Sequence, residues 1–201
     1  KGNKWDFFPA VAAAWRISDE PWMKSTQSWL SNLKLRLSYG VTGNAGAAEY
    51  ATMAYSKTGI IGFQDVGEPY STYGKNVANL ALGWEKSAMT DIGLDLGLLK
   101  GRIDVVADWY STHTRNLLFQ RSLPYAVGGS STSNFIMWDN VGKTKNTGFE
   151  LAVTGHIFDT KNFKWDATLS FATNHEEVVK TTSDKPLKFD GYQYLIVGQP
   201  V

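Results

Sequence analysis

Residues 90–110 alternate apolar and polar side chains on both sides of a Lys-Gly pair, Lys100-Gly101. Apolar residues hold even positions before this pair and odd positions after it: Ile92, Leu94, Leu96, Leu98, then Ile103, Val105, Ala107 and Trp109. A two-residue turn at Lys100-Gly101 sets Leu96 opposite Val105, and the other apolar residues follow in register, so one face of the hairpin is wholly apolar. A slip of one residue would mix the two faces, so the pattern predicts a single register. Lys has to take positive φ in a type I′ turn, which leaves a bulged turn as an alternative.

Four further segments alternate in the same way and are predicted to be strands: residues 7–17, 33–42, 147–158 and 163–173. Pro9 cannot donate a ladder hydrogen bond and marks an end or an edge of the first segment. Several segments exceed the roughly 5–6 residues typical of globular sheets and reach the roughly 9–11 residues that cross a bilayer with tilt. Such two-faced strands either pack their apolar face on a protein core or turn it to lipid while the polar face lines a barrel.

The predicted connections alternate in length along the chain. Lys100-Gly101 and residues 159–162 are short, and strand counting places the turn at residues 18–32, with a predicted short helix, at the same end. Residues 44–83 and 112–146 form long loops at the opposite end. This asymmetry favours an all-β, antiparallel, up-and-down transmembrane barrel wall of roughly eight strands, with the helix in a periplasmic turn.

Tryptophans support the same interpretation. Trp15 and Trp165 fall near the short-turn end, and Trp84 falls near the long-loop end. Two aromatic girdles of this kind flank the apolar band of membrane proteins, whereas a soluble sandwich has no reason to place tryptophans in this way.

Composition excludes several classes of function. A net charge of +1 without a basic run gives no reason to expect nucleic acid as a partner. Cysteine is absent, and the three histidines, His113, His156 and His175, are far apart in the sequence, so no metal or other cofactor is predicted. No stretch approaches the ~18 apolar residues of a transmembrane helix. The negative mean hydropathy agrees with strands in which every second residue is polar.

The barrel interpretation assigns a face to each strand residue. The predicted lumen-facing residues are Lys34, Arg36, Asp91, Asp95, Asp104, Asp108, Glu150, Lys164 and Asp166. The predicted lipid-facing residues are Leu35, Leu37, Ile92, Leu94, Leu96, Ile103, Val105, Trp109, Leu151, Val153, Trp165 and Leu169. The carboxylates of the central hairpin could also be those of a glycosidase, but nothing desolvates one relative to another. We expect them to pair with Lys34, Arg36 or Arg102, and no catalytic residue is predicted.

Aromatic residues of the long loops are the candidates for contact with a ligand or partner: Tyr50, Tyr55, Tyr70, Tyr73 and Trp138. Tyrosine and tryptophan present a flat apolar face with a hydrogen-bonding tip, which suits both sugar rings and protein interfaces. The alternative is that these side chains pack the loops onto one another.

Four segments carry a family resemblance when taken together and in order: FFPAVAAAWRIS (7–18), WLSNLKLRLSYGVTGN (29–44), LGWEK (82–86) and NVGKTKNTGFEL (140–151). They resemble the SusC/RagA family of TonB-linked outer-membrane transporters, and they are spread over residues 7–151. The resemblance implies that residues 1–201 are part of a barrel of about 22 strands, without the plug domain and the remaining strands.

The same resemblance implies a function and partners. It implies a Bacteroidetes-type nutrient importer of the cell outer membrane, surrounded by lipid, that takes up oligosaccharides or peptides and is not an enzyme. A SusD-like surface lipoprotein would cap the barrel, and the TonB complex would drive it through N-terminal parts absent from this chain. Two other functions stay open on the residues alone, a soluble β-sandwich carbohydrate-binding module and a glycan-active enzyme.

Overall fold

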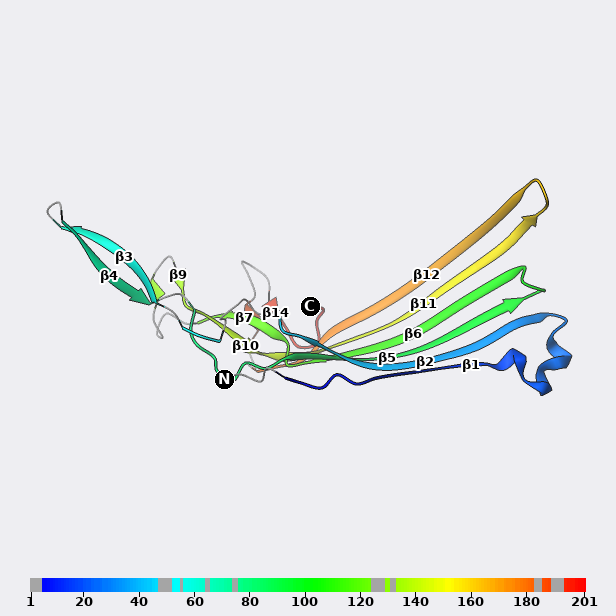
Figure 1. Cartoon of the computed structure of the whole chain (residues 1–201), viewed down its shortest axis with the longest axis horizontal. Helices are drawn as coiled ribbons and strands as arrows, with labels where there is room; N and C mark the ends of the chain where they lie inside the picture. The colour runs from blue at the N-terminus through cyan, green and yellow to red at the C-terminus, as the bar shows by residue number, and fades with distance from the viewer. Residues whose placement is uncertain are drawn as a thin grey trace.

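The computed structural model describes residues 5–46, 52–54, 56–63, 66–73, 76–123, 129–130, 133–182, 186–188 and 194–201. Its main feature is one antiparallel sheet of six strands, which lie side by side as a long curved ribbon (Figure 1). In sheet order the strands are β1 (Ala10–Arg16), β2 (Leu30–Asn44), β5 (Glu85–Leu98), β6 (Ile103–Arg115), β11 (Gly142–Asp159) and β12 (Lys164–Thr181). Strands that follow one another in the chain are neighbours, so the topology is an up-and-down meander with β1 and β12 at its edges.

The register of the sheet places the apolar residues in continuous rows. One row consists of Leu35, Leu94, Ala107, Leu151 and Phe171, and the next of Leu37, Ile92, Trp109 and Phe149. Leu96 is opposite Val105, which confirms the register predicted for the central hairpin. Since paired residues of neighbouring strands point to the same side, these rows make one face of the sheet apolar.

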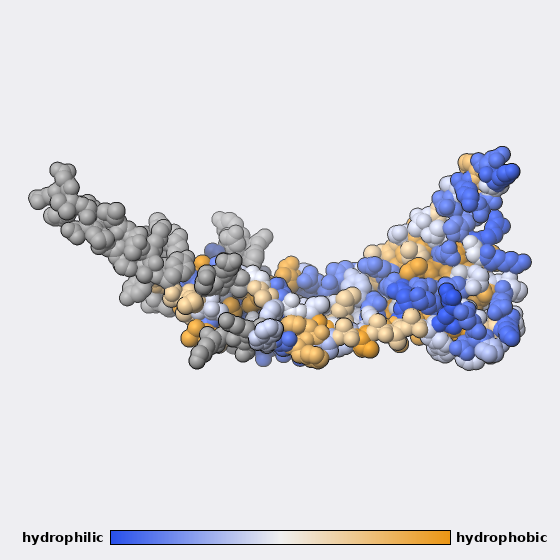
Figure 2. Space-filling model, in the orientation of Figure 1, coloured by the Kyte–Doolittle hydropathy of each residue, from blue (hydrophilic) through white to orange (hydrophobic). Residues whose placement is uncertain are grey.

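No second layer of the described residues covers this apolar face. Leu169 is 75% exposed, Phe171 57% and Trp109 43%, and Leu94, Val105 and Leu151 are only partly buried. Figure 2 shows apolar residues spread along the strands and hydrophilic residues at the end that carries the short turns. A β-sandwich buries such a face against a second sheet, so the β-sandwich alternative is wrong for this fold.

The turn between β5 and β6 is longer than predicted. It comprises Leu99–Arg102, and both Gly101 and Arg102 donate backbone hydrogen bonds to the Leu98 carbonyl, at 3.1 and 3.0 Å. Leu99, Lys100 and Gly101 all have positive φ, at 52°, 59° and 80°. The two-residue turn was therefore wrong, although the strand register is unchanged, because the extra residues lie outside the ladder.

A β-bulge in β11 lets the apolar residues of the β11–β12 hairpin share one face although the loop has an even number of residues. Both segments are apolar at odd positions, which predicts a loop of three or five residues, yet the last pair, Asp159 with Lys164, leaves a loop of four. The register shifts between His156 and Phe158, so Ile157 has no partner. This extra residue turns Phe158 to the apolar face, where its ring stacks on Trp165 with centroids 6.0 Å apart.

The connection between β1 and β2 holds two 3₁₀ helices, η1 (Ile17–Asp19) and η2 (Pro21–Thr26). The prediction of a short helix in this connection is confirmed, but the structure has two 3₁₀ helices there instead of one. Glu20 and Met23 donate i→i−3 backbone hydrogen bonds, to Ile17 and Glu20, as is usual in the short 3₁₀ segments that connect other elements. β1 begins at Ala10, directly after Pro9, as the missing N–H of Pro9 requires.

The long connections contain small sheets of their own. Residues 44–83 include a hairpin of β3 (Ser56–Phe63) and β4 (Val66–Tyr73), which projects away from the main sheet (Figure 1). In residues 112–146, β7 (Leu118–Ser122) pairs with β10 (Ile136–Asn140), and β8 (Gly129–Ser130) pairs with β9 (Ser133–Asn134). β7 does not continue β6, because Asn116, at φ 56°, turns the chain between them.

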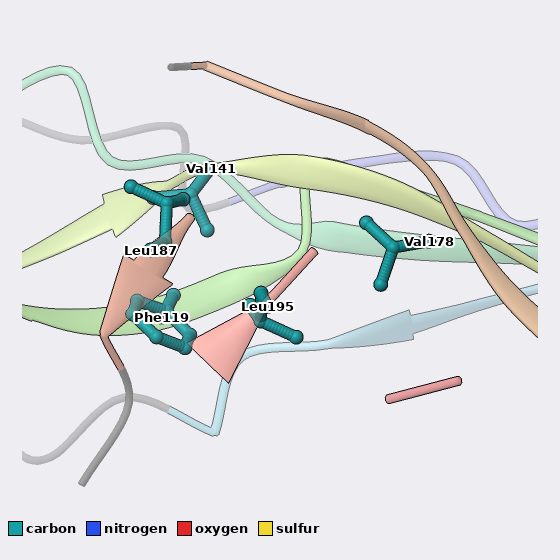
Figure 3. Close-up of a cluster of buried hydrophobic side chains, with 5 residues drawn as sticks. All are labelled: Phe119, Val141, Val178, Leu187 and Leu195. Atoms are coloured by element: carbon teal, nitrogen blue, oxygen red, sulfur yellow. The ribbon is translucent and has the colours of Figure 1, made fainter. Parts of the chain in front are cut away.

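A small hydrophobic cluster lies at the end of the sheet that carries the long loops. Its buried members, drawn in Figure 3, are Phe119, Val141, Val178, Leu187 and Leu195. They come from β7, the β10–β11 junction, β12 and the short pair β13 (Leu187–Lys188) and β14 (Tyr194–Leu195). Within the described residues, no helix is long and apolar enough to span a membrane.

Candidate functional site

The polar face of the sheet lies opposite the apolar rows and collects most of the charged residues predicted to share a wall. Arg36, Gly93, Asp108 and Glu150 form one cross-strand row, and Lys34 and Asp95 are paired in the next. Because the side-chain period of a strand is two, every member of these rows points away from the apolar face. This polar face, built by β2, β5, β6, β11 and β12, is the candidate functional site.

Arg36 lies across β5 and reaches carboxylates on two strands. Its Nη2 is 2.9 Å from Asp95 Oδ1 and 2.8 Å from Asp108 Oδ1, and its Nε donates to Asp95 Oδ1 at 3.0 Å. Gly93 lies between Arg36 and Asp108 in register, and a Cβ at this position would overlap both side chains. Lys34 adds a second cation 3.8 Å from Asp95. The expected pairing of the hairpin carboxylates with Lys34 and Arg36 is therefore present.

His156 lies between two carboxylates from neighbouring strands. Its Nδ1 is 2.7 Å from Asp166 Oδ1 on β12, and its Nε2 is 3.1 Å from Asp104 Oδ2 on β6. A neutral imidazole donates through one nitrogen only, whereas an imidazolium donates to both carboxylates. Sequence reasoning gave His156 no role, although the predicted β11–β12 hairpin places it directly opposite Asp166.

Tyr110, on β6, repeats the arrangement of Arg36 two strands further along the sheet. It lies over Gly148, where a Cβ would overlap its ring, and its hydroxyl donates to Asn174 Oδ1 at 3.2 Å. A side chain on one strand thus crosses a glycine on the next and binds a partner on the third. Sequence reasoning missed this pair, since Tyr110 and Asn174 are far apart in the chain and meet only through the register.

Other charged residues near the polar face take no part in the hydrogen-bond and ion-pair networks of Arg36, His156 and Tyr110. Arg102, the third cation considered for this pairing, donates to the Ile157 carbonyl at 3.4 Å rather than to a carboxylate. Lys164 pairs with Asp159 at 2.9 Å, at the turn end. Across the described residues, no group of three potential ligands is arranged to hold a metal ion.

The loop aromatics predicted to make contacts are only partly placed. Tyr50 and Tyr55 lie outside the described residues, and Tyr70 and Tyr73 are positions of β4. Trp138 is half-buried in β10, and its carbonyl accepts a hydrogen bond from Asn79 Nδ2 at 2.9 Å.

Aromatic pairs mark both ends of the sheet. At the short-turn end Trp15 packs edge-on against Trp22, with centroids 6.1 Å apart, and the half-exposed Trp165 stacks on Phe158. At the loop end Trp84 packs against Phe8 with centroids 5.5 Å apart.

Comparison with known proteins agrees with this geometry. The family model "TonB dependent receptor-like, beta-barrel" matches residues 1–196. The chain is 33% identical to TonB-dependent receptor P3 of Formosa agariphila over 94% of its length and 18% of that protein. It is 34% identical to TonB-dependent receptor SusC of Bacteroides thetaiotaomicron, covering 90% of the chain and 18% of SusC. The chain thus spans about a fifth of the length of the curated relatives it matches.

Solved structures show the same likeness. The RagAB peptide importer in its open-open state superposes with a TM-score of 0.79 and 26% identity, covering 96% of this chain and 20% of that one. TonB-dependent receptors as a family are outer-membrane transporters and not enzymes, so the family gives no support to the glycosidase alternative for the carboxylates of the polar face. The chain belongs to the SusC/RagA group of the TonB-dependent receptor β-barrel family, and it forms an open section of such a barrel.

Proposed function

We propose that this chain forms part of the wall of a TonB-dependent nutrient importer, with its apolar face toward lipid and its polar face toward the lumen. The observation that carries the proposal is the uncovered apolar face, continuous across six strands and opposite a face of paired charges. A soluble protein would leave this surface in water, at a cost of roughly 25 cal/mol for each Å² of apolar area. In this orientation the short turns face the periplasm and the long loops face the exterior.

The lumen face would be lined by the networks around Arg36, His156 and Tyr110. Two other lumen-facing carboxylates, Asp91 and Glu150, have no ion pair among the described residues and are open to solutes. Because these charges are paired, they leave the lumen face with little net charge, and each exposed pair adds only about 0–1 kcal/mol to stability.

The proposed substrate is an oligosaccharide or a peptide, and the proposed partner is a SusD-like surface lipoprotein above the long loops. Support for a peptide comes from the RagAB structures, which are described as those of a peptide importer. Coupling to the TonB complex would use regions of the receptor beyond this section of wall. The loop aromatics Tyr50, Tyr55, Tyr70, Tyr73 and Trp138 are the proposed contacts to substrate or lipoprotein.

Uptake by cells tests this function. A strain lacking the receptor is complemented with the wild-type gene, and the accumulation of labelled oligosaccharides and of labelled peptides is measured with and without a functional TonB complex. We expect TonB-dependent accumulation of one substrate class in the complemented strain only. If the deletion strain accumulates both substrate classes as well as the complemented strain does, the importer function is rejected.

A further inference from the structure

Four cations meet in one cross-strand row near the loop end of the sheet. Lys86 on β5 is paired with Arg115 on β6, Arg115 with Lys143 on β11, and Lys143 with Lys180 on β12. We call these four residues the basic row. Their side chains share one side of the sheet, because paired residues do.

The basic row lies on the apolar face. Lys86 is an even-numbered residue of β5, like Ile92 and Leu94, and Lys143 is an odd-numbered residue of β11, like Leu151. A groove of about 550 Å³ confirms this placement, since Lys86, Arg115 and Lys143 line it together with the apolar Phe7, Pro9 and Val41. The groove therefore offers positive charge and hydrocarbon surface side by side.

The row has few anions of its own. Lys86 Nζ is 2.7 Å from Asp6 Oδ1, and Glu177 is the register partner of Lys145, one row closer to the apolar band. Arg115, Lys143 and Lys180 are exposed and make no ion pair among the described residues. Like charges placed directly opposite each other destabilise a sheet. A bound anion would reduce this repulsion within the basic row.

The height of the row along the strands identifies where that anion sits. Lys86 precedes Leu98, the last residue of β5, by twelve positions, which is about 40 Å along the strand at roughly 3.3 Å per residue. With a strand tilt of about 40°, this is about 30 Å along the bilayer normal, slightly more than the roughly 25 Å apolar band of such barrels. The row thus lies where the outer leaflet changes from hydrocarbon to headgroups.

We propose that the basic row binds the phosphate group of a phosphorylated glycolipid in the outer leaflet, with the lipid's acyl chains against Phe7, Pro9 and Val41. Lysine and arginine are the usual phosphate ligands of proteins, and basic pockets at membrane surfaces hold anionic headgroups. A soluble anion would use the charges but would gain nothing from the apolar side of the groove. The proposal rests on the outward orientation of the apolar face proposed above.

Binding to nanodiscs tests the proposal. The complete receptor is reconstituted in phosphatidylcholine nanodiscs containing monophosphoryl lipid A or its dephosphorylated form, and bound lipid is counted by native mass spectrometry. The test variant is Arg115→Gln, Lys143→Gln, Lys180→Gln. The matched control removes three exposed cations at the short-turn end, Lys24→Gln, Lys100→Gln, Lys161→Gln.

We expect the wild type and the control to retain the phosphorylated lipid and the test variant to bind it on the order of a hundredfold more weakly. A charge-preserving variant, Arg115→Lys, Lys143→Arg, Lys180→Arg, should bind like the wild type, which separates loss of charge from misfolding. Equal binding by wild type and test variant overturns the proposal, as does equal binding of phosphorylated and dephosphorylated lipid. Release of the lipid by millimolar inorganic phosphate would instead indicate a site for a free anion and also overturns it.

Nutrient uptake distinguishes this proposal from the importer function on which it rests. Wild-type cells that bind the lipid but show no TonB-dependent uptake would reject the importer and leave the lipid site standing. Normal uptake together with unchanged lipid binding in the test variant would reject the lipid site alone.

Discussion

At the level of single residues, glycines decide which side chains can lie flat on the polar face. Gly93 makes room for the Arg36 guanidinium, and Gly148 makes room for the ring of Tyr110. The two sites differ in what surrounds them. At Gly93 the neighbours are the ends of flexible side chains, whereas at Gly148 an added Cβ would also lie 2.8 Å from the Thr173 carbonyl, which is backbone.

This difference predicts unequal costs for the same substitution. Gly148→Ala should reduce the free energy of unfolding by about 1–3 kcal/mol, because backbone has to move to accept the methyl group. Gly93→Ala should cost less than about 1 kcal/mol, because Arg36 and Asp108 can shift. Denaturant titration of the reconstituted barrel measures both, and a larger loss for Gly93→Ala would contradict the explanation.

The apolar face makes a prediction at Ile92, which lies midway between Lys86 and Leu98 on β5. Ile92→Arg places a charge on the proposed lipid face near the bilayer midplane and should cost about 2–4 kcal/mol, whereas Leu96→Arg, two residues from the end of β5, should cost about 0–1 kcal/mol. Val106 provides the control, since it lies on the opposite, polar face beside Asp95, and Val106→Arg should change stability by less than about 0.5 kcal/mol. Unfolding of the variants in lipid vesicles gives the comparison. Near-neutral behaviour of Ile92→Arg would contradict lipid contact there.

At the level of elements, the bulge at Ile157 keeps the faces of the β11–β12 hairpin aligned up to its turn. Without an extra residue, the odd-numbered apolar positions of β11 and β12 and a four-residue loop could not coexist. The bulge is placed next to His156, so the histidine keeps its position between Asp104 and Asp166 while Phe158 reaches the aromatic group at the turn.

Deletion variants test this role of the bulge. Removing Ile157 should be tolerated, because His156 and Phe158 then follow one another and still pair with Asp166 and Trp165. Removing Val153, in the regular part of β11, should prevent assembly, because the residues on one side of the deletion then exchange faces. Heat-modifiable migration of outer-membrane fractions on gels reports assembled barrel. Equal assembly of both deletions would show that the register is not set by the faces.

At the level of the whole molecule, no other described part of the chain packs on the apolar face of the sheet, and no strand pairs with its outer edges at β1 and β12. Among the residues that the structure describes, only the small cluster around Phe119 and Val141 is buried in the manner of a globular core. Stability of the sheet therefore depends on the surroundings of the apolar face more than on packing within the chain.

This dependence predicts how the isolated 201-residue chain behaves. In buffer it should aggregate through the exposed apolar face and the free strand edges, whereas in detergent it should keep a β-sheet circular dichroism spectrum. Sedimentation and light scattering with and without detergent make the comparison. A soluble monomer in buffer would contradict the assignment of the apolar face to lipid.

Much of the fold follows from the alternation of apolar and polar residues along the strands. The register of the central hairpin, the strand nature of β2, β11 and β12, and a strand end or sheet edge at Pro9 are all predicted, because side-chain period and backbone chemistry are local properties. The first strand is shorter than the predicted residues 7–17, since it begins only after Pro9. The turn at Leu99–Arg102, the bulge at Ile157 and the division of the short helix into two 3₁₀ helices were missed, since several local geometries satisfy the same pattern.

The sequence by itself determined that the chain makes strands with one polar and one apolar face, because the face on which a residue lies depends only on its position in the alternating pattern. Only the tertiary structure decided which charges meet, as in Arg36 with Asp108, His156 with Asp104 and Asp166, and the basic row. These contacts join strands that are distant in the chain, and their pairing depends on the order and stagger of the whole sheet, which no single segment encodes.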